Sequence, residues 1–217
     1  MKEKKIDNFT IFIFDEVYDP ADDSLLLADN LAVNPGDLVI EVGSGCGIIS
    51  ILAAAKGGKR VVAIDVSPPA ARNTLYNVRV NGMEGVIDVL VADLLNAIKP
   101  EEMFDVVLFN PPYLPVEEDG ILEASWSGGK TGREVIERFI ENVRNYIKFD
   151  GRCQIVLSSL MKPQTVIRKL KKIGFKAELV AEKRFFFEKI CVVTFHRSAS
   201  SCPPDQGGDR LHPLTPL

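Results

Sequence analysis

The 217-residue sequence predicts an α/β fold with a seven-stranded, mostly parallel sheet and an antiparallel hairpin at its C-terminal end. First, short β-rich runs alternate with helix-like segments, a pattern that places helices on both faces of a parallel sheet. Second, the first five runs are almost continuously apolar, as strands covered on both faces are. Third, only a short link, residues 182–189, separates the last two runs, which predicts that they pair as a hairpin.

Each predicted element follows from a local pattern. Strands are predicted where short runs are rich in β-branched and apolar residues, at 38–42, 60–66, 86–91, 104–109, 152–158, 176–181 and 190–195. Helices are predicted where apolar residues recur at helical spacing, at 21–32, 47–56, 68–81, 133–147 and 162–173. Pro68 suits the first turn of its helix, and Gly174 suits the C-cap of the last helix.

Composition limits the class of protein. Of the residues, 46% are hydrophobic and 26% charged, and the formal net charge is −4. The length fits one domain, and the acidic balance disfavours a surface that binds nucleic acid by neutralising phosphates. No apolar run approaches the roughly 20 residues of a membrane span, and the first ten residues lack the apolar stretch of a secretory signal. We therefore expect a cytoplasmic protein.

The chain divides into one predicted domain, residues 1–197, and a tail, residues 198–217. The tail is rich in proline and has almost no apolar periodicity, so we expect it to be disordered. Four cysteines lie far apart without a C-x-x-C pair, and the chain has two histidines. This pattern disfavours a zinc or disulfide framework, and no metal is expected in the site.

The most informative stretch is EVGSGCG, between the first predicted strand and the next helix. Gly43, Gly45 and Gly47 allow a tight turn and the close approach of a ligand to the backbone around Ser44. The G-x-G-x-G spacing differs from the G-x-G-x-x-G of dinucleotide enzymes, and Glu41 would repel a pyrophosphate. A ligand with a cationic amine beside a ribose fits better. The alternative is a tight strand–helix turn that binds nothing.

Two aspartates follow the next two strands. Asp65 ends the second strand, where a carboxylate can accept hydrogen bonds from ribose hydroxyls. Asp93 lies just beyond the third strand, from where it could face the exocyclic amine of adenine. The residues after them, Val66 and Leu94, are expected to line the same site. Each aspartate alone could be a helix N-cap, but acidic residues ending three consecutive strands around a glycine turn favour a bound nucleoside.

The fourth strand ends in Asn110-Pro-Pro-Tyr113. Pro111 and Pro112 stiffen the backbone and push the residue before each away from helical geometry. The Asn110 side-chain oxygen and the Pro111 carbonyl could thus act as two fixed acceptors for one NH₂ group, with Tyr113 as a flat wall. This arrangement suits a planar amide or aromatic amine. The alternative is a proline-rich turn without catalytic function.

Together, these motifs resemble those of the Rossmann-like class I S-adenosylmethionine-dependent amino-methyltransferases. Two further segments, VYDPADDS at residues 17–24 and GG…GREVIERFI at residues 128–140, resemble the HemK-like release-factor glutamine methyltransferases. Within that family, the likeness is closest to the short archaeal and eukaryotic branch. The resemblance covers roughly residues 10–197.

The resemblance implies a function and its residues. The methyl donor would be S-adenosylmethionine, and the acceptor would be the glutamine amide in the Gly-Gly-Gln loop of a peptide-chain release factor. Tyr18, Pro20 and Ser24 would join the glycine turn and the aspartates in binding the cofactor. The catalytic residues would be Asn110, Pro111, Pro112 and Tyr113.

The resemblance also implies a partner. Bacterial members carry a helical substrate-binding domain before the catalytic one, but only about twenty residues precede Pro20 here. Recognition would therefore come from the catalytic domain or from a partner, such as the small zinc-binding activator that pairs with members of the short branch. In the family strand order 3-2-1-4-5-7-6, the strand from Val86 to Val91 lies at an edge, and Asp88 is its only charge. We expect a partner strand there, unless the chain's own loop or tail covers it.

Other functions remain open at this point. The N-P-P-Y motif also occurs in methyltransferases that modify adenine or guanine, a protein lysine is another acceptor, and a catalytically silent subunit is a fourth reading. Four acidic residues follow the motif, and they would repel a phosphate backbone: Glu117, Glu118, Asp119 and Glu123. They favour a protein substrate over stable binding of nucleic acid.

Overall fold

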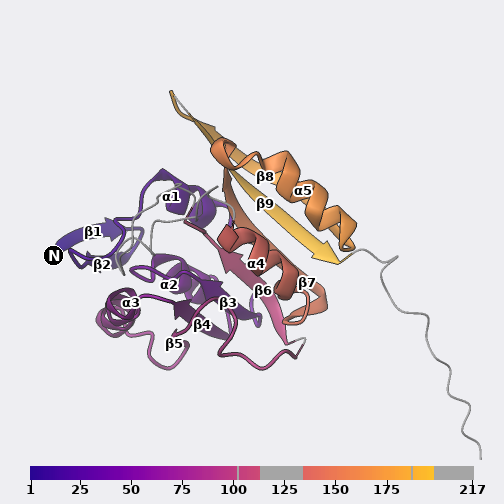
Figure 1. Ribbon diagram of the computed structural model, residues 1–217. Helices are drawn as coiled ribbons and strands as arrows, with labels where there is room; N and C mark the ends of the chain where they lie inside the picture. Colours follow the sequence, from indigo (N-terminus) through magenta and orange to yellow (C-terminus); the bar gives the residue numbers. More distant parts are fainter. Residues whose placement is uncertain (102, 113–133, 187, 198–217) are drawn as a thin grey trace, which may run out of the picture.

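The structure, a computed structural model, describes residues 1–101, 103–112, 134–186 and 188–197 (Figure 1). Its main sheet has the strand order β5-β4-β3-β6-β7-β9-β8, with parallel pairing from β5 to β7 and β9 antiparallel to both neighbours. The strands are β3 (Leu38–Val42), β4 (Arg60–Asp65), β5 (Ile87–Val91), β6 (Phe104–Phe109), β7 (Ile147–Ser158), β8 (Phe175–Arg184) and β9 (Lys189–Arg197). The predicted fold class, hairpin and strand order are confirmed.

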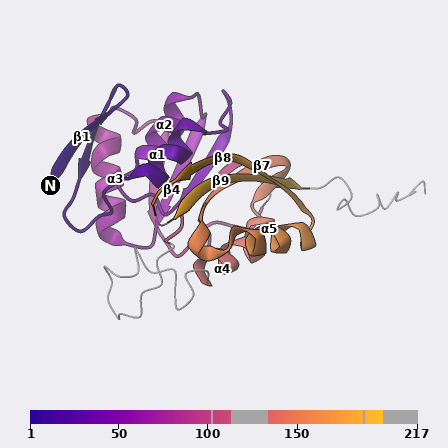
Figure 2. The same ribbon diagram turned by 90° about the horizontal axis from the view of Figure 1, so that it is seen from above.

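Helices cover both faces of this sheet (Figure 2). They are α1 (Asp22–Asp29), α2 (Ile48–Ala55), α3 (Pro68–Val80), α4 (Glu134–Val143) and α5 (Pro163–Lys172). Strand side chains alternate between the two faces, so Val39 and Val61 pack with α1, α2 and α3, whereas Ile40 and Ile64 pack with α4 and α5. Two apolar cores therefore hold the strand ends in place.

One predicted boundary is wrong. The sequence placed a helix over residues 133–147, but α4 ends at Val143 and Ile147 already begins β7. Ile147 pairs with Phe104, and the register then shifts before Arg152 pairs with Val106. Gly151 allows this shift, because an added Cβ would lie 3.0 Å from the Phe104 carbonyl oxygen. The strand thus begins earlier than its apolar run indicates.

The structure also has an N-terminal hairpin that the sequence pattern does not predict. Strands β1 (Lys2–Ile6) and β2 (Phe9–Ile13) pair antiparallel and form a separate two-stranded sheet beside α3 (Figure 1). Asp7 adopts φ 52° in the turn between them, a left-handed conformation that aspartate tolerates better than most residues. Ile11 and Ile13 of β2 are buried in the core that contains α1, α2 and α3.

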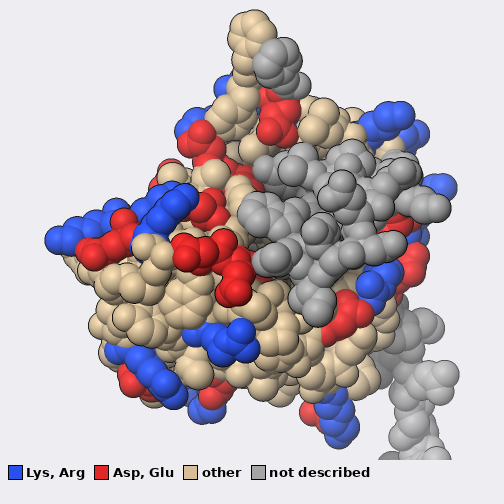
Figure 3. All heavy atoms as spheres, turned by 60° about the vertical axis from the view of Figure 1, so that its left-hand side comes forward, with Lys and Arg blue, Asp and Glu red and all other residues tan. Residues whose placement is uncertain are grey.

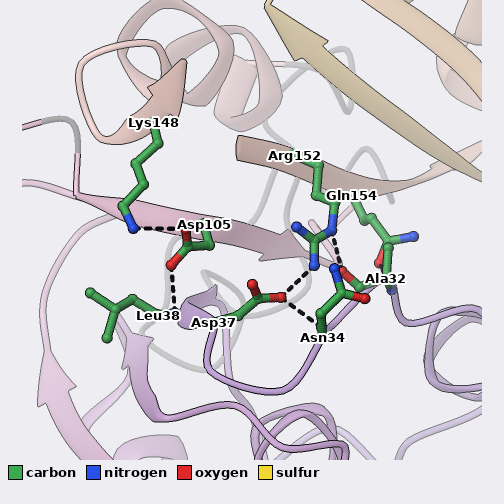
Figure 4. Close-up of polar contacts among 8 residues, drawn as sticks. All are labelled: Ala32, Asn34, Asp37, Leu38, Asp105, Lys148, Arg152 and Gln154. Atoms are coloured by element: carbon green, nitrogen blue, oxygen red, sulfur yellow. Dashed lines mark hydrogen bonds and ion pairs between the residues drawn. The ribbon is translucent and has the colours of Figure 1, made fainter. Parts of the chain in front are cut away.

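Polar contacts hold the amino ends of the strands together (Figure 4). Asp105 of β6 accepts hydrogen bonds from Lys148 Nζ at 2.7 Å and from the Leu38 backbone N–H at 2.8 Å. Partial burial opposes ionisation, but these two donors keep the pKa of Asp105 below its ordinary value. Arg152 of β7 forms an ion pair with Asp37, just before β3. These contacts connect β3, β6 and β7 on the side of the sheet where the parallel strands begin. The cavity described next lies on the opposite side, where these strands end.

Candidate active site

A cavity of about 510 Å³ lies at the carboxyl ends of β3, β4 and β6. Both its volume and its place in a parallel α/β sheet are typical of ligand sites. Most of the predicted site residues line it: Tyr18, Pro20, Ser24, Glu41, Gly43, Ser44, Gly45, Asp65, Val66, Asp93, Leu94, Asn110, Pro111 and Pro112. Gly47 is not among the lining residues, and Tyr113 lies outside the described residues.

The glycine turn has the conformation that its sequence predicts. Gly43, Gly45 and Gly47 have φ values of 71°, 57° and 84°, a region that other residues rarely adopt. An added Cβ at Gly45 would meet nothing within 4 Å. An added Cβ at Gly47 would lie 2.8 Å from Thr74 Cγ2, so this glycine allows the loop to pack against α3. Gly45 therefore leaves room for a ligand, and Gly47 shapes the turn.

Asp65 fastens this turn to the start of α3. One carboxylate oxygen accepts a hydrogen bond from the Gly45 backbone N–H at 2.8 Å, and the other accepts one from the Ser67 backbone N–H at 2.9 Å. Burial raises the pKa of Asp65, although these backbone donors oppose the effect. A carboxylate can accept about four hydrogen bonds, so Asp65 can still bind a hydroxyl group in the cavity.

Glu41 is buried at the base of the cavity. Its carboxyl group forms a hydrogen bond with the Ser50 hydroxyl of α2. Burial raises the pKa of Glu41 to about 8, and the charge of Asp65 adds to this shift. Near neutral pH the ligand-free side chain is therefore mostly protonated. A cationic group placed beside it would favour the carboxylate.

Asp93 differs from these two acidic residues because its side chain is partly exposed. It lines the cavity together with Leu94 and forms an ion pair with Arg138 of α4. Leu94 adopts φ 51°, which turns the chain sharply after β5. The structure thus brings Asp93 to the predicted site, and it adds Arg138, a neighbour that the sequence analysis did not identify.

Asn110 lies at the end of β6 with its amide held in one orientation. Its Nδ2 donates hydrogen bonds to Asp23 Oδ2 at 3.1 Å and to Ser24 Oγ at 3.2 Å. Its Oδ1 is buried and has no hydrogen-bond partner among the described residues. A buried oxygen without a partner is costly and uncommon. Asn110 can therefore accept a hydrogen bond from a group that enters the cavity.

Asp23 is a site residue that the sequence analysis missed. Its Oδ1 accepts hydrogen bonds from the Tyr18 hydroxyl at 3.0 Å and the Ser24 backbone N–H at 2.7 Å, while its Oδ2 binds Asn110. Asp23 thus links the first turn of α1 to the end of β6. The signal was its position directly before Ser24, inside the segment that resembles the HemK-like enzymes.

A seven-stranded sheet in this order, with a glycine turn after β3 and acidic residues at the ends of β3, β4 and β5, defines a Rossmann-like class I methyltransferase. The family model for the methyltransferase small domain matches residues 15–187. The chain belongs to this family, and within it to the HemK-like S-adenosylmethionine-dependent methyltransferases.

Three curated relatives match this chain over almost their whole length. The Methanocaldococcus jannaschii protein MJ0928, provisionally named a protein N5-glutamine methyltransferase, is 40% identical over 197 residues, which cover 89% of this chain and 98% of the relative. Human methyltransferase HEMK2 is 32% identical over 198 residues, covering 85% and 92% of the two chains. The catalytic subunit of the Schizosaccharomyces pombe eRF1 methyltransferase, mtq2, is 24% identical over 210 residues, covering 85% and 90%.

Solved structures agree with the family. The E. cuniculi Mtq2–Trm112 complex, described as methylating the translation termination factor eRF1, matches with a TM-score of 0.64 and 27% identity over 84% of this chain and 99% of that one. The M. jannaschii tRNA m1G37 methyltransferase has a TM-score of 0.66 at 16% identity, over 90% and 54% of the two chains. This second likeness concerns the fold alone.

The cavity fits S-adenosylmethionine, the methyl donor of this enzyme family. Open space beside Gly45 leaves room for a ligand against the glycine turn. The buried carboxyl groups of Glu41 and Asp65 offer acceptors for an ammonium group and for ribose hydroxyls. The protein is therefore an S-adenosylmethionine-dependent methyltransferase. No helix among the described residues is long and apolar enough to cross a membrane.

Proposed function

We propose that the protein transfers a methyl group from S-adenosylmethionine to the side-chain amide nitrogen of a glutamine in a protein. We further propose that this glutamine lies in the Gly-Gly-Gln loop of a peptide-chain release factor and that the reaction takes place in the cytoplasm. The observation that carries the proposal is the buried, unpartnered Oδ1 of Asn110, a residue that lines the cavity and whose Nδ2 is bound to Asp23 and Ser24.

The chemistry explains why a fixed acceptor is needed. An amide nitrogen is a poor nucleophile because its lone pair is delocalised into the carbonyl group. When bound, S-adenosylmethionine supplies a methyl carbon activated by a sulfonium. Asn110 Oδ1 and the Pro111 carbonyl would accept hydrogen bonds from the two N–H groups of the substrate amide. This would turn the lone pair of the amide nitrogen towards that carbon. Such positioning supplies about 7–11 kcal/mol in favourable cases, and the same acceptors stabilise the positive charge that develops on nitrogen.

The remaining site residues would bind the cofactor. In this proposal Asp65 binds the ribose hydroxyls, Asp93 faces the adenine amine and Glu41 lies near the cofactor's ammonium group. Tyr113 would form a wall against the planar substrate amide. No strong general base is required, since the methylated amide nitrogen loses its extra proton readily.

A protein substrate is supported by the relatives and is compatible with the described surface. Two similar proteins carry names that describe methylation of eRF1. On the face in Figure 3, acidic and basic side chains lie side by side over the N-terminal hairpin. Near the cavity, Asp19 pairs with Lys4 and Asp22 pairs with Lys183. At these two positions the lysines are paired with acidic residues and are therefore not free to neutralise phosphates.

We also propose that a small activator protein adds a strand at β5, as the resemblance implies. Among the described residues, β5 pairs with β4 alone. Leu90 and Val91 are 36% and 55% exposed, large values for apolar side chains. Asp88, the charge on this strand, is paired with Arg60 of β4 at 2.6 Å. An apolar, unpaired edge of this kind suits strand addition, and the similar Mtq2 structure was solved as a complex with Trm112.

Incubation with labelled S-adenosylmethionine tests the substrate. The panel comprises a release factor, the same factor with its Gly-Gly-Gln glutamine replaced by alanine, histone, DNA and RNA, each with wild-type protein and with Asn110→Ala. We expect label on the intact release factor alone, and on the order of 100-fold less of it with Asn110→Ala. Label on histone lysine or on a nucleic-acid base, with the release factor unlabelled, would contradict the proposal.

A co-purification assay with Val91→Lys tests whether the activator binds at the β5 edge. An unchanged yield of the activator would rule out strand addition at β5.

A further inference from the structure

One face of α3 carries a row of polar side chains that the proposed reaction does not use. Asn73, Asn77 and Asn81 are four residues apart and so lie on the same side of the helix axis. Thr74 lies beside them. The side chains of Asn73, Thr74 and Asn77 are fully buried, and most buried polar groups in proteins have hydrogen-bond partners.

These asparagines bind the backbone of the N-terminal hairpin. Asn77 Oδ1 accepts from the Phe12 N–H at 2.9 Å, and its Nδ2 donates to the Phe12 carbonyl at 2.7 Å. Asn73 accepts from the Phe14 N–H at 2.8 Å. Asn81 makes the equivalent pair of bonds with residue 10, at 3.1 and 3.0 Å. The side-chain amides therefore occupy the place of a neighbouring strand along β2.

The same face of α3 also binds the glycine turn. Asn77 Nδ2 donates a second hydrogen bond to the Cys46 carbonyl at 2.8 Å. Thr74 Oγ1 donates to the Gly45 carbonyl at 3.0 Å and lies 3.0 Å from the Ser44 hydroxyl. Asn77 is thus one side chain with bonds to both the hairpin and the turn that lines the cavity.

The hairpin reaches the cavity by a second route. Lys4 Nζ of β1 donates to the Pro20 carbonyl at 3.1 Å and forms an ion pair with Asp19. Lys2 also pairs with Asp19, at 3.2 Å. Asp19 lies between Tyr18 and Pro20, two residues of the cavity wall. The hairpin therefore contacts one wall of the cavity directly, and it contacts the glycine turn through Asn77.

We propose that the N-terminal hairpin braces the cofactor cavity and that Asn77 is the positioning residue that joins the hairpin to the glycine turn. This inference rests on the cofactor-binding part of the proposed function. Asn77 acts through the Cys46 carbonyl, which fixes the turn around Gly45 in the conformation that leaves room for the ligand. Because linkage between two sites is reciprocal, a ligand that orders the turn must also stabilise the hairpin.

Hydrogen exchange of the full chain, with and without S-adenosylhomocysteine, tests this linkage directly. The readouts are the backbone amides of Phe12 and Phe14, which bind asparagines of α3 and do not line the cavity. We expect the ligand to slow their exchange. Calorimetry on the wild-type protein tests the cavity separately, since absence of ligand binding would contradict the cofactor site itself. If the ligand binds while exchange at both amides stays the same, the brace is wrong.

Three variants separate the two contacts of the asparagine row. Asn77→Ala removes bonds to the hairpin and the turn, and Thr74→Val removes bonds to the turn only. Asn81→Ala removes bonds to the hairpin and one to the Asn77 backbone carbonyl, but none to the turn. We expect Asn77→Ala to weaken S-adenosylhomocysteine binding by about tenfold, within the usual range of coupling between sites, and to abolish the ligand-dependent protection of Phe12. Asn81→Ala is the matched control, with affinity within about twofold of wild type.

The outcomes separate positioning from plain structural support. If Asn77→Ala lowers the melting temperature as Asn81→Ala does but keeps wild-type affinity and ligand-dependent protection, the positioning role is wrong. Thr74→Val should weaken ligand binding while the exchange of Phe12 in the free protein stays close to wild type. Should Asn77→Ala fail to fold, the wild-type exchange measurement and Thr74→Val still decide the question.

Discussion

The two halves of the cavity differ in how their polar groups are satisfied. Around the glycine turn, the carboxylate oxygens of Asp65 are already bound to backbone N–H groups, and the turn carbonyls are bound by α3. Around Asn110, the NH₂ group donates to two acceptors, Asp23 Oδ2 and Ser24 Oγ, and the oxygen is left unpaired. The first half is preformed for binding, and the second leaves one acceptor for the substrate, so the two should respond differently to mutation.

The largest effect is expected at the unpaired oxygen. Asn110→Ala removes the acceptor that orients the substrate amide, so turnover should fall on the order of 100-fold or more. Affinity for S-adenosylhomocysteine should stay close to wild type, because the glycine turn and Asp65 are untouched. Steady-state kinetics and calorimetry check the two parts. Loss of cofactor binding in this variant would show that Asn110 belongs to the other half of the cavity.

Asp65→Ala should produce the opposite result. The variant removes the carboxylate that holds the glycine turn and faces the cavity, so cofactor affinity should fall by about 1–3 kcal/mol. Calorimetry with S-adenosylhomocysteine is the measurement. Asp105→Ala is the matched control. Asp105 also accepts a hydrogen bond from a backbone N–H, but it lies at the amino end of β6, away from the cavity. Equal affinities for the Asp65 and Asp105 variants would contradict the ribose-binding role.

Glu41 should make the ligand-free protein sensitive to pH. In the unfolded chain its carboxyl group ionises near 4.5, whereas burial raises the pKa in the folded protein to about 8. The folded state therefore binds more protons between these values, and this contribution to stability is lost as the pH rises through that window. Glutamine does not titrate, so Glu41→Gln should not lose stability in this way. The free energy of unfolding of the variant, measured in urea and compared with that of the wild type, should therefore increase from pH 5 to pH 8. Parallel pH profiles for the two proteins would rule this out.

The smallest effect is expected at the exposed ion pair between Asp93 and Arg138. Both side chains are about half exposed, and such pairs contribute less than about 1 kcal/mol. Arg138→Ala should therefore change the free energy of unfolding by at most that amount, with any remaining effect decreasing at high salt. A larger loss would mean that the pair belongs to the preformed half.

The main sheet could be predicted because each of its strands is apolar enough to identify. The parallel strands are covered on both faces, so runs such as residues 60–66 and 104–109 are nearly continuous. The N-terminal hairpin was missed because β1 is largely exposed and because β2 pairs on one side with side chains of a helix. Period-two alternation describes strand faces, and it does not reveal amide groups standing in for a neighbouring strand.

The site was predictable at the ends of the strands and less so elsewhere. Glu41 and Asp65 lie at the ends of strand runs in the sequence and Asn110 directly follows one, and a parallel sheet brings such positions together at the carboxyl ends of its strands. Asp23 and Arg138 come from helices, and their contacts with Asn110 and Asp93 span 87 and 45 residues. Helix periodicity gives the face on which such a side chain lies, but the packing of helix on sheet decides which strand end it meets.

The asparagine row has a consequence for solubility. A lone two-stranded hairpin normally leaves two backbone edges that can recruit strands from other molecules. Here β2 is sealed on its outer side by Asn73, Asn77 and Asn81, and β1 carries lysines along its length. Replacing the three asparagines together should therefore expose a strand edge beside the apolar side chains of β2 and make the protein prone to aggregation.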